Sequence, residues 1–227
     1  RYNEPFVKVF EEERELTLML VVDVSRSSQY GSHEQFKMEI LTEISATLAF
    51  SALQNNDKVG LILFTDQIEL YIPPKKGKSH ILRIIRELIE FKPHSDQTNI
   101  SEALKFMANV QKKRAIVFVL SDFMDVEYAT NLKIAAKKHD LTGIRIYDKH
   151  EVELPNLGLV PMVDQETGKY QLVHTGSKKL QNNHQKHIRE RGSYFDESFR
   201  KSGAGTISCR TDESYVKKLL SYFKNRG

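Results

Sequence analysis

Residues 16–28 read LTLMLVVDVSRSS, an apolar run that passes into a cluster of oxygen-bearing side chains. The nearly continuous apolar residues from 16 to 24 are typical of a strand that is buried on both faces of a parallel sheet. Alternate residues of an extended segment point the same way, so Asp23, Ser25 and Ser27 are expected to face one point beyond the strand. This stretch therefore predicts both the centre of a sheet and a binding position at its edge.

Similar apolar runs recur along the chain and alternate with segments of helical periodicity. We predict strands over residues 16–24, 59–64, 67–72, 115–120, 142–147 and 206–209. Helices are predicted over residues 33–54, 79–91, 98–110, 126–139, 180–201 and 213–224. This alternation indicates a three-layer α/β fold with a doubly wound, mostly parallel six-stranded sheet, Rossmann-like in its architecture.

Two segments depart from the simple alternation. Only Thr65 and Asp66 separate the second and third strands, which predicts one antiparallel edge strand, ended by Pro73 and Pro74. Residues 151–175 contain two prolines and two glycines and predict a β-hairpin insertion with its turn near Gly168. The sequence shows no repeat and no long linker, so we expect a single domain over residues 1–227, with 1–15 as an extension from a preceding segment.

Composition excludes several classes of protein. The 227 residues are 40% hydrophobic and 28% charged, which is typical of a globular chain rather than a disordered or fibrous one. The apolar runs are too short for a membrane span, which needs about 20 residues. The basic residues are scattered and accompany no nucleic-acid motif, so we expect no nucleic-acid partner. Cys209 is the single cysteine and cannot form an intramolecular disulfide, so we expect a protein of the reducing cytoplasm. Because Cys209 lies in an apolar strand, we expect it to be a core residue.

Further oxygen ligands are expected at the same sheet edge as Asp23. Asp122 follows the fourth predicted strand directly, and Thr98 stands at the start of the helix before that strand. Ligands of open α/β sheets bind beyond the carboxyl ends of the strands, where these residues would meet. Two carboxylates and three hydroxyls suit one hard divalent cation, Mg²⁺ or Mn²⁺. Taken alone, each of these residues could instead have a helix-cap or turn role. For Asp66 and Asp125, which flank this edge, two roles stay open: an acid that supports the ligands without binding the metal, or a turn or cap residue.

Other chemistry finds less support in the sequence. The turn after the first strand has only Gly31, whereas a dinucleotide site needs several glycines there. A Mg²⁺-dependent phosphoester hydrolase that uses the same Asp/Ser/Thr cluster is the alternative function, but no general base accompanies the cluster. His184 and His187 form an i,i+3 pair without an evident third metal ligand.

The pattern Asp-x-Ser-x-Ser, then Thr, then Asp resembles the metal-ion-dependent adhesion site (MIDAS) of the von Willebrand factor A (vWA) fold. Asp23, Ser25, Ser27, Thr98 and Asp122 match its positions, and Arg26 departs from the small residue common between the two serines. Longer stretches resemble the C-terminal part of the bacterial domain-of-unknown-function family fifty-eight (YeaD-like): RYNEPFVKVFEEERELT (1–17), NNDKVGLILFTDQIE (55–69), PPKKG (73–77), VLSDF (119–123), KKHD (137–140) and ELPNLGL (153–159).

The resemblance implies a metal-dependent interaction module rather than an enzyme. It implies that the partner is a MoxR-type AAA ATPase or the client of that ATPase. An acidic side chain of this partner would bind the metal. The Bat (aerotolerance) clusters are one setting of such pairs. Some family members carry membrane helices in a preceding segment, so the resemblance allows membrane attachment of an otherwise cytoplasmic protein.

Overall fold

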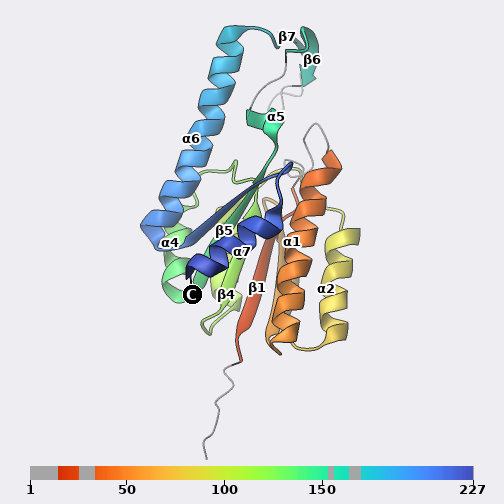
Figure 1. Cartoon of the computed structure of the whole chain (residues 1–227), viewed down its shortest axis with the longest axis vertical. Helices are drawn as coiled ribbons and strands as arrows, with labels where there is room; N and C mark the ends of the chain where they lie inside the picture. Colours follow the sequence, from red (N-terminus) through yellow and green to blue (C-terminus); the bar gives the residue numbers. More distant parts are fainter. Residues whose placement is uncertain (1–14, 26–33, 153–155, 164–169, 227) are drawn as a thin grey trace, which may run out of the picture.

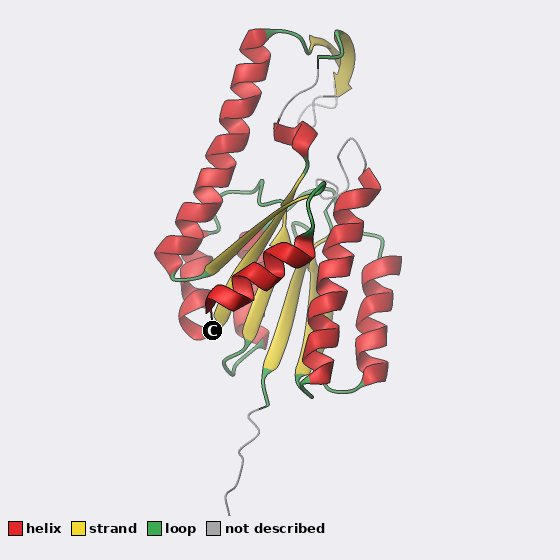
Figure 2. Ribbon diagram, viewed as in Figure 1, coloured by secondary structure: helices red, strands yellow, loops and turns green. Residues whose placement is uncertain are grey.

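Six strands form the central sheet, in the order β3-β2-β1-β4-β5-β8 (Figures 1 and 2). The structure is a computed structural model that describes residues 15–25, 34–152, 156–163 and 170–226. β3 is antiparallel to β2 and the other neighbours are parallel, which confirms the predicted doubly wound sheet with one antiparallel edge strand. The strands are β1 (Thr17–Asp23), β2 (Lys58–Phe64), β3 (Ile68–Lys75), β4 (Ile116–Ser121), β5 (Asp140–Tyr147) and β8 (Gly205–Arg210).

β1 lies in the middle of the sheet because both of its faces are apolar. Leu20 and Val22 belong to the core on one face, and Met19 and Val21 belong to the core on the other. All four side chains are fully buried. A strand of this kind needs helices on both sides, and it places its last residue, Asp23, at the carboxyl edge of the sheet.

Helices cover both faces of the sheet (Figure 2). The first core contains residues of α1 (Glu34–Gln54), α2 (Lys78–Glu90) and α7 (Tyr215–Arg226). The second core contains residues of α3 (Ile100–Val110), α4 (Ala129–Lys138) and α6 (Lys178–Ser202). A further helix of four residues, α5 (Lys149–Val152), follows β5 and was not predicted.

The predicted hairpin insertion is present as a separate two-stranded ribbon. β6 (Leu159–Val163) pairs antiparallel with β7 (Tyr170–His174), while the predicted turn at Gly168 lies outside the described residues. The ribbon lies at the far end of α6, which extends beyond the sheet (Figure 1).

Two predicted boundaries differ from the structure by three residues. β3 continues through Pro73 and Pro74 to Lys75, because an edge strand tolerates proline and the β2–β3 register shifts opposite this segment. α4 begins at Ala129 rather than near 126, because Glu127 has a left-handed φ of 69° and its N–H binds the Tyr194 hydroxyl.

Candidate metal centre

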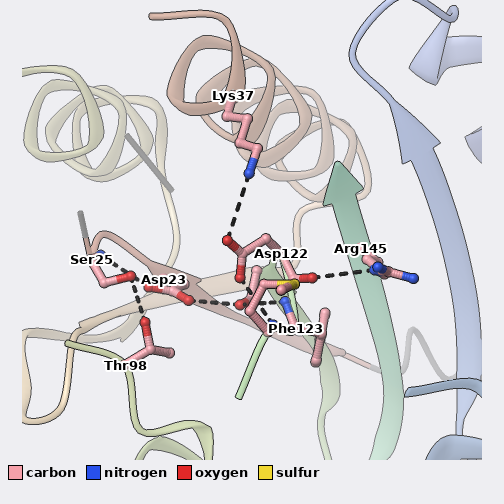
Figure 3. A network of polar contacts seen from close by, with 9 residues as sticks. Asp23, Ser25, Lys37, Thr98, Asp122, Phe123 and Arg145 are labelled. Carbon is pink, nitrogen blue, oxygen red and sulfur yellow. Dashed lines mark hydrogen bonds and ion pairs between the residues drawn. The ribbon is translucent and has the colours of Figure 1, made fainter. Parts of the chain in front are cut away.

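Three loops bring oxygen ligands together at the carboxyl edge of the sheet (Figure 3). Asp23 is the last residue of β1 and Ser25 follows it, Thr98 precedes α3, and Asp122 follows β4. The Thr98 hydroxyl donates a hydrogen bond to the Ser25 hydroxyl over 2.6 Å, although 73 residues separate them in the chain. Four of the five predicted ligands therefore lie in one neighbourhood, and the fifth, Ser27, lies outside the described residues together with Arg26.

Asp23 is the most deeply buried acid of the group, with no exposed surface. Its Oδ1 accepts from the Ser25 backbone N–H at 3.0 Å, and its Oδ2 accepts from the Ser121 hydroxyl at 2.6 Å. Burial and the negative charge of Asp122 raise the pKa of Asp23 to about 7, against the opposing hydrogen bonds from Ser121 and Ser25. Near neutral pH, the Asp23 carboxyl is thus either protonated or ionised, and a nearby cation stabilises the ionised form.

The loop that carries Thr98 is fixed by its neighbour Asn99. The Asn99 N–H donates to the Thr65 carbonyl at the end of β2 over 2.9 Å. Its Oδ1 accepts from the Glu102 N–H, also at 2.9 Å, and so Asn99 is the residue that caps α3. The alternative role considered for Thr98, that of helix cap, is therefore wrong, and the Thr98 side chain contacts Ser25 instead.

Asp122 is held from two sides. Its Oδ1 accepts from the Met124 N–H at 3.1 Å, and its Oδ2 lies 3.6 Å from the Lys37 ammonium of α1. The Arg145 guanidinium of β5 donates to the Asp122 carbonyl over 3.3 Å (Figure 3). Lys37 and Asp122 are only 2% and 4% exposed, so this ion pair is shielded from water.

These donors fit a hard divalent cation. The four described ligands present carboxylate and hydroxyl oxygens, which are the ligands that Mg²⁺ and Mn²⁺ prefer. The mutual repulsion that raises the pKa of Asp23 is the kind that a cation between two carboxylates relieves. Within the ranges that the structure describes, no three His, Cys, Asp or Glu side chains gather into a ligand cluster of another type.

Three residues of this neighbourhood were not predicted from the sequence: Ser121, Lys37 and Arg145. A signal existed for Lys37, because it stands four and seven residues before Leu41 and Ile44 on the buried stripe of α1. A lysine at such a position requires a buried negative partner. Ser121 stands in the sequence stretch VLSDF (119–123) without an assigned role, and nothing local in the sequence marks Arg145.

The flanking acids have structural roles. Asp125 accepts from the Ile100 N–H at the start of α3 at 2.9 Å and from its neighbour Val126 at 2.6 Å. It therefore ties the loop after β4 to α3, and burial raises the pKa of this carboxyl. Asp66 is exposed and accepts a hydrogen bond from Thr65. Cys209 is a core residue, as predicted, with 1% of its surface exposed.

An aromatic cluster joins the loop after β4 to α6. Phe123 follows Asp122 directly, has a left-handed φ of 54° and is fully buried. Its ring centroid lies 4.4 Å from that of Phe195 and 5.4 Å from that of Phe199, both on α6. The fully buried Tyr128 ring packs edge-on against Phe123 at 5.9 Å. The backbone of the candidate ligand Asp122 is thus anchored next to the base of α6.

Comparison with known proteins agrees with this fold. An uncharacterized protein of Mycobacterium tuberculosis is 22% identical over 231 residues, covering all of this chain and 72% of the relative. The conserved hypothetical protein BatB of Bacteroides thetaiotaomicron has a similar structure, with a TM-score of 0.54 at 17% identity over 93% of this chain and 97% of BatB. An aerotolerance-related membrane protein of Bacteroides fragilis, solved with multiple mutations to serines, has the same TM-score and identity. The match covers 93% of this chain and 100% of the Bacteroides fragilis chain.

The term membrane protein describes the Bacteroides fragilis relative alone. For the described part of this chain, no helix combines the length and the apolar character that a bilayer crossing requires. The family model described as "Protein of unknown function DUF58" matches residues 1–194. The chain therefore belongs to the DUF58 family, as the resemblance predicted, and it shares its α/β fold with BatB and the aerotolerance-related protein.

Proposed function

We propose that the chain is a metal-dependent protein-interaction module whose binding site is the carboxyl edge of the sheet. One Mg²⁺ or Mn²⁺ ion would be held by Ser25, Ser27 and Thr98, with Asp23 and Asp122 supplying negative charge. The observation that carries the proposal is the 2.6 Å contact between Thr98 and Ser25 beside two buried acids at the ends of β1 and β4.

The acids and the hydroxyls of the proposed metal site have different roles. The buried Asp23 orients the turn after β1 by accepting from the Ser25 N–H, and Ser121 keeps the Asp23 carboxylate in place. Thr98 and Ser25 present neutral hydroxyls, so a bound ion would keep much of its positive charge. A divalent ion in such a setting supplies an open coordination position for a carboxylate oxygen. An Asp or Glu side chain of the partner protein would occupy that position.

The partner we propose is a MoxR-type AAA ATPase or the client protein on which that ATPase acts. Support comes from the resemblance of the chain to the family fifty-eight proteins and from the shared fold of the BatB and aerotolerance-related proteins. The interaction would be lost in a chelator, because the acidic partner side chain depends on the ion for its contact.

The test is calorimetric titration of Mg²⁺ and Mn²⁺ into the wild type, Asp23→Ala and Asp66→Ala. Asp66→Ala is the matched control, because Asp66 is an exposed acid at the same edge. We expect one saturable site in the wild type and the control and none in Asp23→Ala. If circular dichroism shows Asp23→Ala to be unfolded, the half-buried Thr98→Ala replaces it. Equal binding by every variant would refute the site.

Association with the partner is tested by pull-down of the ATPase with and without EDTA. We expect binding in Mg²⁺ that EDTA and Asp23→Ala both abolish. Binding that EDTA leaves unchanged would contradict a metal-mediated contact. The alternative function, hydrolysis of phosphoesters, predicts instead release of phosphate from a generic ester in Mg²⁺ that Asp122→Ala abolishes.

A further inference from the structure

Lys37 is an unusual residue for the interior of a protein. It lies on the core-facing stripe of α1 with Leu41 and Ile44, and it is among the largest side chains that are fully buried. Its ammonium points toward the site and lies 3.6 Å from Asp122 Oδ2 (Figure 3). The helix thus delivers a positive charge to the carboxylate that is proposed to balance the metal.

A buried ammonium is costly unless an anion compensates it. Asp122, itself 4% exposed, is such an anion for Lys37. The same carboxylate lies near Asp23, because its negative charge contributes to the raised pKa of Asp23. Lys37 therefore lies beside one of two neighbouring acids, and the proposed divalent ion would bind near the same pair of acids.

We infer that Lys37 is a built-in counter-cation of this site, which neutralises Asp122 in the absence of metal and lowers the affinity of the site for a divalent ion. The inference rests on the proposed function, since it concerns the same metal. Asp23, Asp122 and Lys37, with both acids ionised, sum to a formal charge of −1 without metal and +1 with it. Lys37 therefore adds one positive charge beside the loaded site, which favours an acidic partner.

The physical reason is repulsion inside a shielded site. A divalent ion and an ammonium that share one carboxylate repel each other, and the low dielectric of the interior strengthens this repulsion. We expect removal of the Lys37 charge to tighten the binding of Mg²⁺ and Mn²⁺ by about tenfold or more. The metal-free variant should be less stable than the wild type, because Asp122 loses its buried counter-charge.

The experiment is calorimetric titration of Mg²⁺ and Mn²⁺ into the wild type, Lys37→Met and two controls, with melting temperatures in EDTA and in metal. Lys37→Arg keeps the charge and should bind within a few fold of the wild type. Lys105→Met removes a lysine that is 59% exposed beside Glu102, so it makes the same change in net charge without touching the site. We expect tighter binding and a larger metal-induced rise in melting temperature only for Lys37→Met.

The outcomes separate this inference from the proposed function. Metal binding to Lys37→Met that is equal to or weaker than wild-type binding overturns the role of Lys37 and leaves the metal site standing. No binding to any variant overturns both. If Lys37→Met unfolds even in metal, Lys37→Gln takes its place, because it removes the charge and keeps a polar end; a folded Lys37→Gln with wild-type affinity also overturns the inference.

Discussion

The hydrogen bond from Ser121 to Asp23 offers a sharp test of how the site is held. Ser121 is fully buried, and its hydroxyl donates to Asp23 Oδ2 over 2.6 Å while it accepts from the Phe123 N–H at 3.0 Å. Ser121→Ala removes both contacts. It leaves a buried carboxylate without one of its donors and a buried N–H without its acceptor.

The expected cost follows from these two losses. A hydrogen bond to a charged group contributes about 1.5–3 kcal/mol, and a buried donor left unpaired costs about 1–3 kcal/mol. We therefore expect Ser121→Ala to lower the free energy of unfolding by about 3–5 kcal/mol at pH 8. Near pH 5 the cost should be smaller, because the raised pKa of Asp23, about 7, means that its folded carboxyl is then protonated and the charged part of the bond is absent.

The assay is urea unfolding in EDTA at pH 8 and pH 5, with Ser45→Ala as the matched control. Ser45 is also fully buried, and its hydroxyl finds no hydrogen-bond partner among the described residues. The same chemical change there should alter the free energy of unfolding by less than about 1 kcal/mol. Equal free energies of unfolding for the two variants at pH 8, with the same slope against urea concentration, would refute this role of Ser121.

Three further outcomes follow from the structure. Because burial and Asp122 raise the pKa of Asp23 to about 7, a divalent ion must displace a proton below that pH. Metal affinity measured by calorimetry should thus be constant above pH 7 and fall by up to about tenfold per unit below it, and an affinity unchanged from pH 5.5 to 8 contradicts this. Gly143→Ala should destabilise the protein by about 1–3 kcal/mol in urea unfolding, because a methyl group there meets the ring of Phe199, whereas Gly60→Ala meets flexible methionine atoms and should cost less; the reverse order would be inconsistent with the packing. The buried Cys209 thiol, whose pKa burial raises to about 11, should react with a disulfide reagent only after unfolding, so prompt labelling of the native protein would count against its place in the core.

The sequence predicted the sheet well because its strands have a simple cause. β1, β2 and β4 are buried on both faces, so their central residues are nearly all apolar and stand out against any helical pattern. The candidate ligands were predictable for a related reason. Parallel strands end at one edge, so residues directly after Val22 and Ser121 had to lie near each other.

The residues that were missed depend on contacts distant in sequence. Lys37 and Asp122 are an ion pair between a helix and a strand end 85 positions apart, and no local rule identifies that partner. The cap at Asn99 instead of Thr98 depends on the Thr65 carbonyl, which binds the Asn99 N–H from the turn after β2. The late start of α4 depends on the Tyr194 hydroxyl of α6.

The length of α6 gives the molecule a mechanical property. Its 25 residues extend about 37 Å at 1.5 Å per residue, and its Phe195 and Phe199 pack against Phe123 beside Asp122. The other end, at Lys178, adjoins the β6–β7 ribbon (Figure 1). A tilt of about 5° at Phe199 would displace Lys178 by roughly 3 Å. A small rotation of α6 about its contact with Phe123 would therefore move the β6–β7 ribbon much further than it moves the residues beside Asp122.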